Sequence, residues 1–110
     1  MAVNRRRGEV SGVIGGEERR LCLTLGALAE LEDAFAVEDL SALARRFSGG
    51  ALSARDLTRV IGAGLRGGGA DIGDEAVAGM AIDGGAAGAA RIATELLSAA
   101  FGEGEATANP

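Results

Sequence analysis

The sequence contains no histidine, tyrosine or tryptophan, and it has a single cysteine and a single proline among its 110 residues. Without histidine, general acid–base chemistry would depend on carboxylates alone. The three phenylalanines offer no aromatic platform on which nucleic-acid bases could stack. Cys22 cannot form an internal disulfide, and we predict a buried, unreactive thiol that suits a reducing compartment. We therefore predict a protein that is not an enzyme and that holds no cofactor and no metal.

The charge balance and the short apolar runs argue against a nucleic-acid-binding protein and a membrane-spanning protein. The net charge is −5, from 11 basic and 16 acidic residues, which argues against nucleic acid as the main ligand. Charged residues such as Arg91 and Glu95 interrupt the apolar runs, so no segment is predicted to cross a membrane. The basic cluster at residues 5–7 is not followed by an apolar signal core, and we expect a cytoplasmic protein. Much of the 47% hydrophobic content is alanine, which buries little area, so the core is expected to be thin.

The chain is predicted to form one domain over residues 8–102, between a disordered basic tail at 1–7 and a disordered tail at 103–110. The domain begins with two short strands around a Gly15-Gly16 turn. Cys22 lies in the second of these strands. We expect a mostly α (α+β) fold in which this N-terminal β-hairpin packs on a four-helix cluster.

Start and stop signals place the helices along the rest of the chain. Thr24 is a suitable N-cap for the first helix, which runs to about Phe35, and the next residue is Ala36 rather than glycine. Ser53 and Asp56 have the spacing of a capping box at the start of another helix. The remaining helices are expected at about 37–47, 74–82 and 86–101, and the first two of these are short.

Two apolar helix stripes are the candidate partner-binding residues. If one small domain cannot bury both stripes, the surplus forms an exposed adhesive patch. The candidates are Leu25, Leu28 and Phe35 in the first helix, and Ile92, Leu96, Leu97 and Phe101 in the last. The last helix begins with small residues, for which close internal packing is the simpler interpretation and a docking face for a partner helix is the alternative.

Two further patterns in the third helix have more than one interpretation. Arg55, Arg59 and Arg66 are spaced to share one face. They could form the recognition helix of a helix-turn-helix, but a solvated basic stripe or a patch for an acidic partner is favoured. The stretch 62–67 matches G-x-G-x-x-G, yet it closes a helix rather than opening one, so we interpret its glycines as close packing followed by a helix stop.

Three segments together resemble a known protein family. They are the stretch L-x-L-T-x-G-A-L-A-E-L-E at Leu21–Glu32, the stretch L-S-A-R-D-L at Leu52–Leu57, and the glycine- and alanine-rich final helix. They are similar to the tail proteins of gene transfer agents, a family related to phage tail assembly chaperones. The resemblance extends over residues 8–102. Genes of that family usually lie between those of the tail tube protein and the tape measure protein.

The resemblance implies a non-enzymatic chaperone for assembly of a phage-like tail. Its partners would be the tape measure protein and the tail tube protein, with no small-molecule substrate, and it could form a homo-oligomer. A structural subunit of the tail, which would place the protein in a virion-like particle, is the main alternative. A small DNA-binding regulator that uses the three arginines is the second alternative.

Overall fold

The computed structural model describes residues 8–49 and 51–101, so the predicted tails at 1–7 and 103–110 lie outside the described residues. The predicted α+β class with an N-terminal hairpin is confirmed. The described part of the chain holds five helices, one at each place that the start and stop signals predict and so one more than the cluster of four, and the five-residue helix lies between the two longest ones. In chain order the elements are β1 (Glu9–Ile14), β2 (Glu17–Cys22), α1 (Leu25–Ala34), α2 (Leu40–Ser48), α3 (Ala54–Gly67), α4 (Asp74–Ala78) and α5 (Gly85–Phe101).

The hairpin buries one face and exposes the other. Gly15 and Gly16 take φ values of 66° and 82°, as a tight two-residue turn requires, and Ile14 pairs with Glu17 across it. Since side chains alternate along a strand, Ile14 and Leu21 point into the core, while Val13 on the opposite face is 40% exposed. At the end of β1, Ile14 also forms an antiparallel bridge with Ile82.

Side-chain caps fix where three of the helices begin. The Thr24 side chain accepts a hydrogen bond from the Ala27 amide at 3.1 Å, which confirms the predicted start of α1. The predicted capping box of α3 is also present, since Ser53 and Asp56 each accept the other's backbone N–H at 3.0 Å. The start of α2 is three residues later than predicted because Asp39 is its N-cap.

The end of α1 depends on an alanine in an unusual conformation. Ala36 has φ of 56°, in the left-handed region that favours glycine. The amide of Ala36 donates to the carbonyl of Asp33 at 3.2 Å, and that of Val37 to Glu32 at 3.0 Å. These two bonds form the turn that usually ends a helix at a glycine. The strained conformation of Ala36 ends α1 at this point and separates it from α2.

Replacing Ala36 by glycine is expected to stabilise the protein by about 0.5–1 kcal/mol, because glycine removes the steric cost of the left-handed conformation. Urea denaturation followed by circular dichroism measures the change. Ala29→Gly is the matched control, since Ala29 is an exposed residue inside α1. That control should lose about 1 kcal/mol. Destabilisation by both substitutions to a similar extent would contradict the strain at Ala36.

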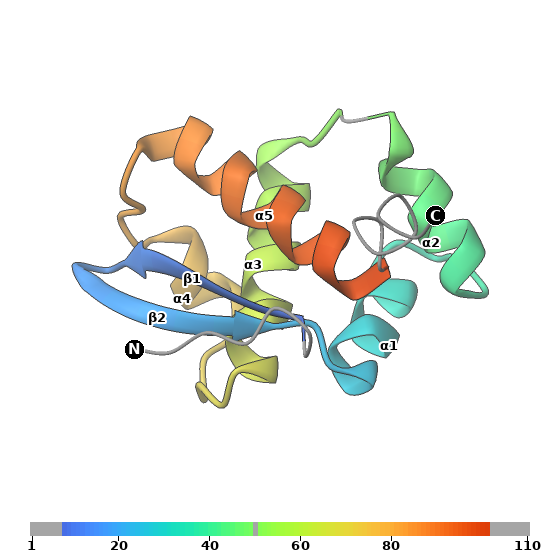
Figure 1. Cartoon of the computed structure of the whole chain (residues 1–110), viewed down its shortest axis with the longest axis horizontal. Helices are drawn as coiled ribbons and strands as arrows, with labels where there is room; N and C mark the ends of the chain where they lie inside the picture. The colour runs from blue at the N-terminus through green and yellow to red at the C-terminus, as the bar shows by residue number, and fades with distance from the viewer. Residues whose placement is uncertain (1–7, 50, 102–110) are drawn as a thin grey trace, which may run out of the picture.

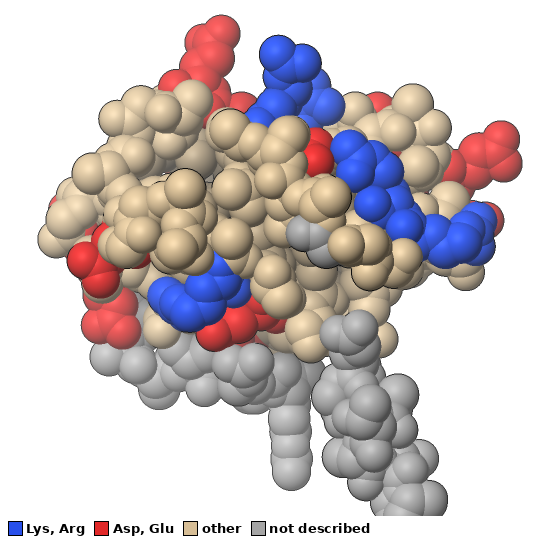
Figure 2. All heavy atoms as spheres, turned by 90° about the horizontal axis from the view of Figure 1, so that it is seen from above, with Lys and Arg blue, Asp and Glu red and all other residues tan. Residues whose placement is uncertain are grey.

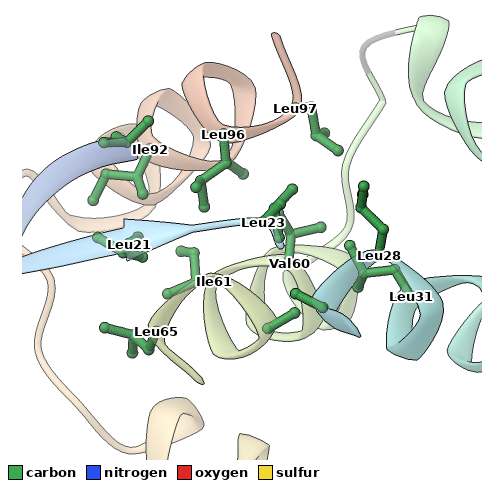
Figure 3. Close-up of a cluster of buried hydrophobic side chains, with 14 of the residues drawn as sticks. Leu21, Leu23, Leu28, Leu31, Val60, Ile61, Leu65, Ile92, Leu96 and Leu97 are labelled. Atoms are coloured by element: carbon green, nitrogen blue, oxygen red, sulfur yellow. The ribbon is translucent and has the colours of Figure 1, made fainter. Parts of the chain in front are cut away.

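Helix α3 lies at the centre of the fold. It contacts β2, α1, α4 and α5, and Figure 1 shows α5 crossing in front of it. In the close-up of Figure 3, the leucines of α5 lie above Val60 and Ile61 of α3, and those of α1 lie to their right. Val60 and Leu65 are fully buried. The hairpin packs its inner face on α5 and α3, and α1 and α2 lie beyond α3 on the far side from the hairpin turn.

The glycines in the second half of α3 and directly after it allow this helix to approach α5 and β2 closely. A Cβ atom on Gly64 would stand 2.8 Å from the Leu96 side chain. One on Gly67 would overlap with the carbonyl oxygen of Cys22, and one on Gly68 with that of Arg20. The close-packing interpretation of the G-x-G-x-x-G stretch is therefore confirmed, because side chains or backbone of neighbouring elements occupy the space beside its glycines.

Candidate partner-binding site

Four of the apolar residues predicted to bind a partner belong to the core instead. Ile92 and Leu96 have no exposed surface, Leu28 is 5% exposed and Leu97 is 9% exposed. They lie in the layer where α1, α3 and α5 meet, which Figure 3 shows. The prediction is corrected for these four side chains, because the single domain buries most of both stripes.

Leu25, in contrast, is exposed to solvent. It is the first residue of α1 and is 80% exposed, since the buried face of that helix is formed by Ala27, Leu28 and Leu31. Its side chain therefore lies apart from the stripe to which the sequence assigned it. It is the most exposed of the large hydrophobic side chains in the described residues.

The remaining surface of the α5 stripe borders a groove between α5 and α2. The groove has a volume of about 470 Å³. Leu97 and Phe101 form its α5 wall, and Phe47 forms the α2 wall. Leu52, in the connection between α2 and α3, also lines it. Its polar lining residues are Arg45, Ser48, Thr94 and Ser98. The site is thus an open apolar groove with a polar rim, which fits an apolar helix or peptide better than a small polar substrate.

The residues predicted from the sequence to bind a partner include part of the lining of this groove. Leu97 and Phe101 were among the predicted residues, whereas Phe47 and Leu52 were not. The available signal was the apolar stripe of the second helix, formed by Leu43 and Phe47, which implies a surface on α2 that something must cover. What the sequence could not provide is the spatial pairing of α2 with the end of α5.

The predicted basic face divides into two parts in the structure. Arg66 is held by Glu30 at 2.7 Å and by Asp74 at 3.0 Å, and it donates to the Ile72 carbonyl at 2.9 Å. The hydrogen bonds to Glu30 and Asp74 raise the pKa of Arg66. Arg66 therefore ties α3 to α1 and α4, and its charge is neutralised within the molecule.

The other two arginines lie near the start of α3. Arg59 donates to the carbonyl of Ala34 at 2.9 Å, and Arg55 is exposed. A recognition helix must enter a DNA groove, but α3 is packed against four other elements, so its geometry does not suit that role. The basic surface that remains at this end of α3 is a small patch without the extended footprint of a nucleic-acid binder.

An arginine that the sequence did not single out joins this patch. Arg46 of α2 donates to both carboxylate oxygens of Asp56, at 3.2 and 3.3 Å. Its guanidinium lies 5.1 Å from the centre of the Phe35 ring and 5.5 Å from that of Phe47. The two rings meet edge to face at 5.1 Å. The cluster fixes α2 against α1 and α3.

The Cys22 thiol and the carboxylates are the groups that could support catalysis or bind a metal. Burial and then the negative charge of Glu9 raise the pKa of the half-buried Cys22 thiol, which lowers its thiolate fraction at neutral pH. Among residues 8–49 and 51–101, no group of three or more histidine, cysteine, aspartate or glutamate side chains has the arrangement of a metal site. The helices of this part of the chain are too short or too polar for any of them to traverse a bilayer.

Comparison with known proteins identifies the family. No curated protein and no solved structure matches the chain. A family model described as "Phage tail tube protein, GTA-gp10" matches residues 7–103, which is most of the 110-residue chain. The match includes the hairpin, the central helix and both walls of the groove. The chain therefore belongs to the phage tail tube protein family GTA-gp10.

Proposed function

We propose that this phage-tail family member is a non-enzymatic assembly chaperone, and that it binds an apolar helix of the tape measure protein in the groove between α2 and α5. The observation that supports the proposal is the groove itself, which Phe47, Leu97 and Phe101 line and where the half-buried Phe101 ring is the most accessible of the three. A helix that lays apolar side chains into such a groove would bury area from both partners.

The proposed mechanism is reversible burial. A long apolar helix that emerges before its tube exists is prone to aggregate, and a small protein that covers part of it lowers the concentration of the exposed form. Binding energy from a groove of this size is modest, so the chaperone would be displaced as tube subunits assemble around the helix. The order of assembly would then follow from competition for the same apolar surface.

A structural subunit of the tail is the second candidate, and the family description favours it. The hairpin weighs against it, because its two strands have six residues each and no other named strand occurs among the described residues. A ring of subunits joined by continuous sheets would need more extensive strands than these.

Co-expression with the tape measure protein tests the chaperone role. The complex is expected to elute together, and Leu52→Asp should weaken binding at least about tenfold, because a carboxylate in the apolar groove loses its hydration. The matched control is Val13→Asp, which places the same charge on an exposed strand residue away from the groove. Equal solubility of the tape measure protein with and without this chain, and no complex, would refute the chaperone role.

Purified mature tails separate the two candidates. A chaperone is absent from them, whereas a structural subunit remains at a fixed ratio to the tube protein. Quantitative mass spectrometry of the particles measures that ratio. Retention of the chain in stoichiometric amount would replace the chaperone proposal with the structural one.

A further inference from the structure

The strongest feature outside the groove is a hollow of about 570 Å³ on the other side of α2, where α1, α2 and the start of α3 meet. Three arginines line it, Arg46 from α2 and Arg55 and Arg59 from α3, together with Phe35. Asp56 is the only carboxylate among its lining residues. The hollow therefore has an excess positive charge in a chain whose net charge is −5. Figure 2 shows basic side chains gathered on the side of the molecule where α2 lies.

We infer that this arginine hollow, formed by Arg46, Arg55, Arg59 and Phe35, binds the carboxylates of an acidic peptide segment of a partner protein. The inference does not depend on the tape measure protein or on the α2/α5 groove, because the two surfaces lie on opposite sides of α2 and share no lining residue.

Two of the guanidinium groups are already held in place. Arg46 lies against the rings of Phe35 and Phe47 and is fixed by Asp56. Arg59 lies 5.6 Å from the centre of the Phe35 ring and donates to the Ala34 carbonyl. Side chains that are ordered before binding lose little conformational entropy when they bind, so these groups form a prepared site rather than a mobile basic surface.

Donor capacity remains open in the hollow. A guanidinium carries five N–H donors, and Asp56 is the only side-chain acceptor that Arg46 contacts within the described residues. Arg59 has one hydrogen bond to backbone, through a single nitrogen. Arg55 has no hydrogen-bond or ion-pair partner in residues 8–49 and 51–101, and it is exposed at the rim. A planar carboxylate can accept two parallel N–H bonds from such a fork.

The small size of the basic area favours a short acidic peptide over a nucleic acid. Three arginines line the hollow, and the neighbouring chain carries exposed Asp33 near the end of α1, and Glu38 and Asp39 before α2. A continuous line of phosphates would extend beyond the three arginines, whereas one or two glutamate or aspartate side chains can enter the hollow alone. The Phe35 ring adds an apolar wall that suits the stem of a glutamate side chain.

Fluorescence anisotropy with labelled poly-L-glutamate as the probe tests this inference. The wild-type chain is expected to bind the probe. Arg55→Glu should weaken binding about tenfold, because Arg55 is the arginine of the hollow whose side chain has no ion-pair partner among the described residues, and the substitution reverses its charge. Arg91→Glu is the matched control, since Arg91 is an exposed arginine of α5 that pairs with Glu95. Circular dichroism establishes that each variant is folded, and Arg55→Ala replaces Arg55→Glu if the latter is not.

The arginine Nε–H resonances of the protein locate the probe. Poly-L-glutamate should shift those of Arg46, Arg55 and Arg59 and leave those of Arg20 and Arg91 unchanged. Equal losses of affinity for poly-L-glutamate in Arg55→Glu and Arg91→Glu would overturn the inference. So would tighter binding of duplex DNA than of poly-L-glutamate, or a protein that binds inorganic phosphate but does not bind poly-L-glutamate. Leu52→Asp should keep full affinity for the probe, so failure of the groove and failure of the hollow are distinguishable.

Discussion

Replacing Gly67 by alanine is expected to destabilise the protein by about 3 kcal/mol, although alanine is the better helix former. Gly67 is the last residue of α3, and a Cβ atom there would overlap with the carbonyl oxygen of Cys22 in β2. A backbone oxygen cannot rotate away, so either the hairpin or the end of α3 must move. The loss appears as a lower midpoint of urea denaturation, while the slope of the unfolding free energy against urea concentration stays unchanged.

Gly26→Ala provides the contrast within the same chain. Gly26 lies in α1, and the nearest atom that a Cβ would meet is the Thr24 hydroxyl at 3.8 Å. This substitution is expected to stabilise the protein by about 0.5–1 kcal/mol, because only the gain in helix propensity remains. The same chemical change should therefore have opposite signs at the two positions. A stabilised Gly67→Ala variant would show that α3 does not approach β2 as closely as the structure indicates.

Asp56→Ala is expected to destabilise the protein by about 2–4 kcal/mol. Asp56 is 6% exposed, caps the N-terminus of α3 through the Ser53 amide, and pairs with Arg46. Its loss removes the cap and leaves the guanidinium of Arg46 without its acceptor. Asp39→Ala is the control, because Asp39 caps α2 from an exposed position and should cost only about 1 kcal/mol. Similar losses in both variants would show that the pair with Arg46 adds nothing.

The pH dependence of stability gives an independent test of Asp56. Burial opposes its ionisation, but the hydrogen bond from the Ser53 amide and the charge of Arg46 outweigh burial and lower its pKa. Since the unfolded-state pKa is about 4, the stabilisation is complete above that pH and is lost as the pH falls through the lower folded-state value. The difference in unfolding free energy between wild type and Asp56→Asn should therefore narrow below about pH 4. A difference that stays constant with pH would contradict the lowered pKa.

Both proposed binding surfaces depend on the position of α2. Its buried contacts are made by Leu43 and Phe47, and Arg46 ties it to Asp56 of α3. One side of α2 forms a wall of the α2/α5 groove and the other side contributes Arg46 to the arginine hollow. Loss of Asp56 should therefore weaken binding at the α2/α5 groove, whereas Leu52→Asp should affect only the groove and Arg55→Glu only the hollow.

Local chemistry in the sequence determined the secondary structure. Gly15-Gly16, Thr24 and the Ser53–Asp56 pair act within a few residues of chain, so their effects can be predicted without knowing the fold. The family resemblance was likewise recognisable from the sequence and agrees with the family match over residues 7–103. The missing glycine after Phe35 did not prevent the helix from ending there, because Ala36 adopts the conformation that a glycine would take.

Only the tertiary structure decided which apolar and basic side chains are available to a partner. Leu96 and Leu97 are neighbours in α5, yet Leu96 has no exposed surface while Leu97, at 9% exposed, reaches the groove. Arg59 and Arg66 share a predicted helix face, but Glu30 and Asp74 neutralise only Arg66. Helical periodicity gives the direction in which a side chain points. Whether another element covers or neutralises it depends on contacts between residues far apart in the chain, and no local pattern encodes those contacts.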